Sequence, residues 1–132
     1  MPETLQTLPD NWADPVLTAA QAQSLLNKPH HVLFTHGGGH LLASLPPGMP
    51  ADILTLYVPE SQRRRGHART LMAALVGAAE QAGCTALTLE VNAANTAAMA
   101  LYRSLGLAQT AIRKNYYGPG QNALVLTRPL TL

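Results

Sequence analysis

An arginine-rich segment is the strongest chemical signal in the sequence. Arg63, Arg64 and Arg65 precede Gly66, and Arg69 follows it, between an apolar run and a long helical pattern. The first turn of a helix leaves four backbone N–H groups without intrahelical partners, and a phosphate can accept hydrogen bonds from them. Because glycine has no Cβ, a ligand can approach the backbone there closely. The segment therefore predicts a site for a compact polyphosphate, and a solvated basic turn is the alternative.

A pair of histidines could bind a metal only with further ligands. His36 and His40 flank the glycines of HGGGH, and no carboxylate or cysteine accompanies them in the sequence, so we expect no metal site. No helix follows Gly37 to Gly39, so we interpret them as a hairpin turn rather than a phosphate loop. Cys84 lies between a glycine and a threonine, and we interpret it as a small buried residue without a chemical role.

Composition limits the classes of protein that fit this chain. Its 132 residues suit one domain, 1–132, and 47% apolar with 12% charged residues is a globular composition. No apolar run approaches the roughly 20 residues that span a bilayer, and the first ten residues do not form a leader pattern, so we expect a cytoplasmic protein without a membrane partner. The net charge is only +2, and no aromatic residues alternate with the arginines, so we expect no nucleic-acid partner.

The pattern of apolar residues predicts a mixed α/β (α+β) fold. We expect residues 1–17 to form an irregular arm that Trp12 anchors to the body, because they show no periodicity. The expected elements are a helix at 18–27, strands at 31–35, 41–45 and 53–58, a helix at 68–82, a strand at 85–91, a helix at 95–105, and strands at 107–113 and 123–128. This order predicts a parallel strand pair within residues 53–91, followed by an antiparallel hairpin.

Three motifs resemble those of one enzyme superfamily. RRRGHA at 63–68 matches the Q/R-x-x-G-x-G/A acyl-CoA loop of the GNAT N-acetyltransferases. LEVNAANTAAMALYRSLGL at 89–107 resembles their second conserved block, and IRKNYY at 112–117 resembles the tail of the bacterial ribosomal-protein alanine N-acetyltransferases. The chain is thus similar to this family over residues 53–130, which would form the acyl-CoA-binding and catalytic core.

The resemblance implies acetyl-CoA as co-substrate and gives its contacts. In the family, the strand before the loop splays from its parallel neighbour, and the pantetheine arm pairs with the exposed strand edge. Asn95 would contact acetyl-CoA or simply cap its helix, and His67 is a helix-start residue at a variable motif position. The implied cofactor-binding residues are Leu56, Tyr57, Val58, Arg63, Arg64, Arg65, Gly66, His67, Ala68, Arg69 and Asn95.

The resemblance also implies two proton-transfer groups. Glu90 matches the family's general base, acting directly or through water, and we expect burial beside apolar neighbours to tune it for that task. Tyr102 matches the general acid, because a phenol stays protonated at neutral pH and can protonate the leaving thiolate. Backbone amides near Val58 would polarise the thioester carbonyl. A solvated glutamate and a core tyrosine are the plain structural alternatives, and neither a metal nor a covalent intermediate is required.

The resemblance favours an N-acetyltransferase that acts on a primary amine, and the N-terminal α-amine of a protein is the expected acceptor. A small-molecule amine acetyltransferase and a non-catalytic acyl-CoA-binding module are the alternatives. The first 52 residues are short for the superfamily, which places an extra strand and two helices before its central strand, and only one helix is evident here. A homodimer could compensate for the missing part of the acceptor site. Tyr116 and Tyr117 would shape the acceptor groove or simply pack.

Overall fold

The computed structural model describes residues 2–130, which form one seven-stranded sheet with three α-helices and a short 3-10 helix. The strands are β1 (Glu3–Leu5), β2 (His31–His36), β3 (Gly39–Ser44), β4 (Ala51–Tyr57), β5 (Ala86–Asn92), β6 (Ala108–Arg113) and β7 (Ala123–Pro129). The helices are α1 (Ala19–Leu26), η1 (Glu60–Gln62), α2 (His67–Ala82) and α3 (Thr96–Ser104). The strand order is β1-β2-β3-β4-β5-β7-β6, and only the β4–β5 pair is parallel.

The predicted fold class is confirmed, including the parallel pair and the C-terminal antiparallel hairpin of β6 and β7. One part of the prediction is wrong. Residues 1–17 are not wholly irregular, because Glu3–Leu5 pairs with β2 as strand β1. The segment before β4 thus contains three strands and one α-helix, so the extra strand that we expected to be missing is present.

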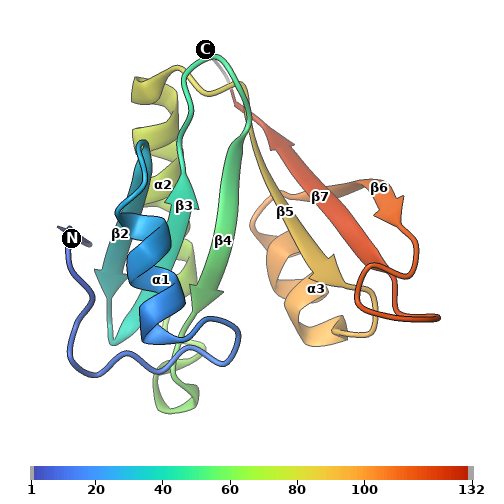
Figure 1. Cartoon of the computed structure of the whole chain (residues 1–132), viewed down its shortest axis with the longest axis horizontal. Coiled ribbons are helices and arrows are strands. Elements are labelled where there is room, and N and C mark those ends of the chain that lie inside the picture. Colours follow the sequence, from blue (N-terminus) through green and yellow to red (C-terminus); the bar gives the residue numbers. More distant parts are fainter. Residues whose placement is uncertain (1, 131–132) are drawn as a thin grey trace.

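Helices cover both faces of the N-terminal half of the sheet (Figure 1). On one face, Leu71 and Leu75 of α2 pack with Leu41 of β3 in the larger core. On the other face, α1 packs through Leu26 on Leu33 of β2 in a smaller core. These contacts follow from the alternation of side chains along each strand, which sends successive residues to opposite faces.

The arm is attached to the body near the start of α1. Thr18 caps α1 in a reciprocal capping box with Gln21, as the sequence predicted. Trp12 packs against the smaller core, and its indole Nε1 donates a hydrogen bond of 2.9 Å to the carbonyl oxygen of Leu17. The predicted anchoring role of Trp12 is therefore confirmed.

The parallel strands β4 and β5 meet only at their starts. They pair at two positions, Ala51 with Leu87 and Asp52 with Thr88, and then diverge toward their carboxyl ends (Figure 1). Just beyond these pairs, the β3–β4 register shifts, and Leu54 is an extra residue in β4. Such a bulge bends a strand and increases its twist. The bulge therefore accounts for an opening in the middle of the sheet.

Two further features concern Cys84 and the length of the helices. Cys84 is fully buried, as predicted, and its Sγ lies 3.4 Å from the carbonyl oxygen of Pro46. Within residues 2–130, no helix is long and apolar enough to cross a membrane.

Candidate functional site

The start of α2 presents backbone N–H groups to the surface. Gly66 is the N-cap and adopts a left-handed conformation with φ 81°, and no side chain caps this end of the helix. Thr70 donates hydrogen bonds to the Gly66 carbonyl oxygen from both its amide and its hydroxyl, each 3.0 Å long. The amides of the first turn are therefore available to an anionic ligand, as predicted from the sequence.

The arginines around this helix start differ in their contacts. Arg63 donates from Nε to the carbonyl oxygen of Val58 at 2.9 Å, so it ties the loop to the end of β4. Arg64 has a positive φ of 63°, which is uncommon outside glycine and marks a tightly constrained turn. Arg65 and Arg69 are exposed. Together these side chains supply positive charge next to the amides of α2.

The side chain of His67 packs against the β2–β3 turn. Its ring packs edge-on against His36, with the centroids 5.1 Å apart. A Cβ added to Gly37, which has a φ of 58°, would lie 2.5 Å from the His67 ring. The β2–β3 turn therefore supports the first residue of α2, and a contact between His67 and a ligand stays a prediction.

The opening between β4 and β5 exposes one edge of β4 next to this loop. Beyond Asp52, β4 has no partner on the β5 side, so Leu56 and Tyr57 end β4 beside the opening, and Val58 follows them. Leu56 packs against the larger core, whereas Tyr57 lines a cavity on the opposite face. An extended ligand could therefore form hydrogen bonds with this edge as an added strand does.

Asn95 is the N-cap of α3 in the structure. Its side-chain oxygen accepts a hydrogen bond of 3.0 Å from the backbone N–H of Ala98. The capping interpretation is thus confirmed, and a ligand contact from this exposed residue stays a prediction.

Tyr102 lies on α3 and packs against the larger core. Burial raises the pKa of Tyr102 above the usual value near 10, and the negative charge of Asp14 raises it further. The phenol therefore remains protonated across the neutral range. It can donate a proton but cannot act as a base there.

Glu90 lies on the expected face of β5 but is exposed. It faces away from the core, because its neighbours Leu89 and Val91 are buried and alternate with it along β5. Glu90 is not buried among apolar residues, so the expectation of burial is wrong. Its Oε1 instead accepts a hydrogen bond of 2.5 Å from Nη1 of Arg113, whose guanidinium also lies 4.2 Å from the ring centroid of Tyr116.

The two candidate proton-transfer groups therefore come from opposite faces of the sheet. Tyr102 approaches from the face that α2 and α3 cover, and Glu90 lies on the face that these helices leave open. An acid on one side and a base on the other suit a reaction in which a leaving group departs on one side and a nucleophile arrives on the other.

A buried carboxylate that we did not predict lies near this site. Asp14 accepts hydrogen bonds from Nε2 of His40 at 2.7 Å and from the hydroxyl of Thr55 at 2.6 Å. It also accepts bonds from the backbone N–H groups of Val16 and Leu17, and its side chain has 0% exposure. Burial alone would raise the pKa of Asp14, but these hydrogen bonds together lower it to about 2.

The sequence held no spacing signal for this contact, because Asp14 and His40 are 26 residues apart. The expectation that His40 has no carboxylate partner is therefore wrong. Its ring also stacks on Trp12, with the centroids 3.9 Å apart. Within residues 2–130, no group of three or more His, Cys, Asp or Glu side chains could hold a metal ion.

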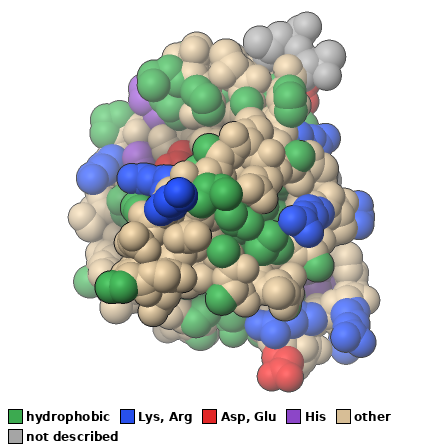
Figure 2. All heavy atoms as spheres, turned by 90° about the vertical axis from the view of Figure 1, so that its right-hand side faces the viewer, with side chains coloured by type: hydrophobic (Ala, Val, Ile, Leu, Met, Phe, Trp, Pro, Cys, Tyr) green, Lys and Arg blue, Asp and Glu red, His purple; other side chains and the backbone are tan. Residues whose placement is uncertain are grey.

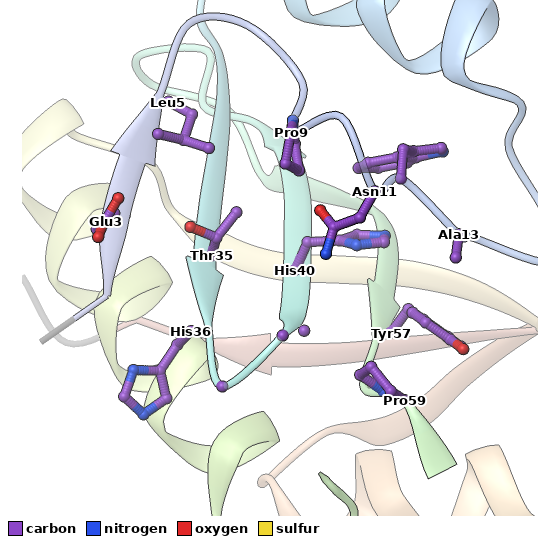
Figure 3. A pocket seen from close by; sticks show the side chains of 14 residues that line it. Glu3, Leu5, Pro9, Asn11, Ala13, Thr35, His36, His40, Tyr57 and Pro59 are labelled. Carbon is purple, nitrogen blue, oxygen red and sulfur yellow. The ribbon is translucent and has the colours of Figure 1, made fainter. Parts of the chain in front are cut away.

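A cavity of about 620 Å³ lies next to this cluster, on the face that α1 shares. Its side chains run from Glu3 on β1, past Thr35 and His40, to Tyr57 at the end of β4 (Figure 3). A second cavity, of about 500 Å³, lies between α2 and the end of α3 and includes Arg69 and Arg128. Figure 2 shows a different face, where Lys and Arg side chains surround a central group of hydrophobic ones.

Comparison with known proteins places this geometry in a family. The sequence model described as "Acetyltransferase (GNAT) family" matches residues 5–107. The [Ribosomal protein bS18]-alanine N-acetyltransferase of Salmonella typhimurium is 38% identical over 85 residues, which are 62% of this chain and 57% of that protein. The matched region is thus little more than half of that relative.

Solved structures with the same fold agree with the sequence match. Ard1 from Thermoplasma volcanium superposes with a TM-score of 0.76 at 27% identity, over 88% of this chain and 82% of that one. The ribosomal-protein-S18-alanine N-acetyltransferase from Escherichia coli superposes with a TM-score of 0.72 at 26% identity, over 88% and 79% of the two chains.

Proposed function

The chain belongs to the GNAT acetyltransferase family, and from this premise we propose that it transfers the acetyl group of acetyl-CoA to a primary amine. We propose further that this amine is the N-terminal α-amine of a protein. The similarity to alanine N-acetyltransferases of ribosomal proteins supports this acceptor, although the chain matches only 57% of the Salmonella relative's length.

One observation carries the proposal of acetyl-CoA as co-substrate. The opening between β4 and β5 adjoins the uncapped start of α2, so a free strand edge and a set of free amides lie in succession. A molecule with a pyrophosphate at one end and an amide-containing arm at the other fits both features. The amides of Gly66 to Arg69 would hold the pyrophosphate, and the edge of residues 56–58 would pair with the arm.

The chain's own groups supply the proton transfers that the reaction needs. Acetyl-CoA supplies the acetyl thioester when it is bound. Glu90 would accept a proton from the acceptor's ammonium, directly or through water, after the acceptor displaces Arg113 from its carboxylate, and the neutral amine would then attack the thioester carbonyl. Tyr102 would hand its phenolic proton to the departing sulfur, and its raised pKa keeps that proton in place beforehand.

Release of the CoA thiol tests the proposal. We would measure it with acetyl-CoA and a peptide that begins with a free alanine, beside the same peptide with a blocked N-terminus and a panel of small amines. We expect turnover of the free peptide alone. Turnover of the small amines alone would instead identify a small-molecule acetyltransferase. Tight binding of acetyl-CoA without any turnover would indicate a binding module.

The two proton-transfer roles predict distinct losses. Tyr102→Phe keeps the ring but removes the proton donor, so we expect kcat to fall by about 10²-fold with little change in the affinity for acetyl-CoA. Glu90→Gln should lower kcat to a similar extent. Arg103→Gln, a neighbouring substitution on α3, serves as the control. Unchanged turnover in Tyr102→Phe would exclude Tyr102 as the acid.

A further inference from the structure

The cavity on the α1 face, here called the arm cavity, adjoins the end of β4. It is lined by Tyr57, and the next residue is Val58, near which the family resemblance implies that backbone amides polarise the thioester carbonyl. From Tyr57 the cavity crosses the ends of β3 and β2 and reaches Glu3 on β1 (Figure 3). It therefore leads away from the proposed reaction centre instead of enclosing it.

The shape of the arm cavity suits a chain rather than a small molecule. Three strand spacings of about 4.8 Å separate β1 from β4, so the cavity is about 14 Å long. An extended peptide rises about 3.4 Å per residue, so about four residues would fill it. A small amine would occupy only the β4 end.

The arm cavity carries negative charge. The ionised carboxylate of Asp14 accepts a hydrogen bond from His40, one of its lining residues, and Glu3 stands at the β1 end. Among the described residues that line the cavity, there is no Lys or Arg.

Positive charge is concentrated outside the arm cavity. Arg63, Arg64, Arg65 and Arg69 gather at the start of α2, where we place the pyrophosphate. Aromatic side chains also line the arm cavity, with Trp12 beside His40 and Tyr57 at the end of β4. A cationic side chain is stabilised both by carboxylates and by the faces of such rings.

We propose that the arm cavity holds the first few residues of the acceptor polypeptide, and that it favours a Lys or Arg side chain at the end near Glu3. This inference rests on the proposed function, because it takes the β4 end as the place of the reacting amine. It makes a polypeptide, rather than a small amine, the substrate that the chain recognises.

The experiment uses alanine-started peptides of two, four and six residues, with lysine or its uncharged analogue norleucine at position four or five. Binding to the full chain in the presence of CoA is measured by calorimetry, beside turnover with acetyl-CoA. We expect affinity to rise from two to about four residues. We also expect lysine to bind ~2- to 5-fold more tightly than norleucine at one of the two positions.

Variants separate the two parts of the proposal. Glu3→Gln should remove the advantage of lysine, whereas Glu80→Gln, an exposed substitution on α2, should keep it. Asn11→Arg, at an exposed position that lines the middle of the cavity, should weaken the six-residue peptide several-fold more than the dipeptide.

Equal affinity for all peptide lengths, or a lysine advantage that survives in Glu3→Gln, would overturn the inference. If every peptide is turned over equally well, the proposed function stands and the cavity has another role. If peptides bind with the expected dependence on length and charge but none is acetylated, the assignment of the cavity stands and the proposed function fails.

Discussion

At the scale of single residues, Asp14 has the most connected side chain near the site. Its carboxylate accepts hydrogen bonds from residues of β3, of β4 and of the chain ahead of α1, so one residue fixes the arm to the sheet. Trp12 and Ala13, which line the arm cavity, directly precede it. Asp14 is therefore a positioning residue for the wall of that cavity.

The lowered pKa of Asp14 predicts how stability depends on pH. A carboxyl group with a pKa of about 2 in the folded state and near 3.8 in the unfolded state stabilises the fold above pH 4. This contribution is lost as the pH falls toward 2, and it corresponds to about 2 kcal/mol. We expect Asp14→Asn to be less stable at pH 7 and to lose less free energy of unfolding than the wild type between pH 5 and pH 2.

Urea unfolding at a series of pH values measures this difference. Asp10→Asn, in the same arm but at an exposed position, provides the control and should follow the wild type. Parallel pH curves for the wild type and Asp14→Asn would mean that Asp14 is not held as described.

Residue types alone could identify part of the site. Gly66 and the arginines beside it were predictable because the loop and its helix are contiguous in the sequence. The contacts of Asp14 with Thr55 and of Glu90 with Arg113 were not, because 41 and 23 residues separate the partners and only the folded sheet brings them together.

At the scale of elements, the β2–β3 turn supports the start of α2. The ring of His67 lies directly over Gly37, so the turn and the helix start share one close contact. A displacement of the turn would move the backbone amides that we propose to hold the pyrophosphate.

A pair of glycine substitutions tests this support. Gly37 and Gly48 both have positive φ angles, so alanine at either position carries a strain of about 1 kcal/mol. Only at Gly37 would the added Cβ meet another side chain, since nothing lies within 4 Å of the position at Gly48. We expect Gly37→Ala to raise KM for acetyl-CoA several-fold and Gly48→Ala to leave it unchanged, as measured by thiol release. Equal KM values would mean that the turn does not support the helix start.

Most elements could be predicted because their own sequences carry a period and clear ends, as α2 does between Gly66 and Gly83. Strand β1 could not. A segment of three residues is too short to show alternation, and it becomes a strand only because the edge of β2 offers it hydrogen bonds. The bulge at Leu54 could not be predicted from the sequence either, since it is defined by the register of β4 with β3.

At the scale of the whole molecule, the sheet consists of two parts joined at the start of β4 and β5. Beyond two residue pairs, the strands separate, and the larger core and α2 hold the parts together. A ligand that lies in the opening would contact both parts, so its binding free energy would add to the stability of their joint state.

Hydrogen exchange can detect this effect. We expect CoA to slow exchange of the backbone amides in residues 54–58 and 66–69, because the ligand would accept or supply hydrogen bonds there. Residues of β6, which lies at the far edge of the sheet, should exchange at the same rate with and without CoA. Protection of β6 with no change in residues 54–58 would contradict the proposed position of the ligand.

The position of β7 has a consequence for the order in which the molecule is completed during synthesis. β7 lies between β5 and β6, and neither of those strands pairs with the other. While the ribosome has yet to release residues 123–129, the strand that carries Glu90 has no neighbour on that side, and β6 has none at all. The growing chain can therefore assemble β1 to β4 early, but it cannot bring Glu90 and Arg113 together until this late segment is inserted.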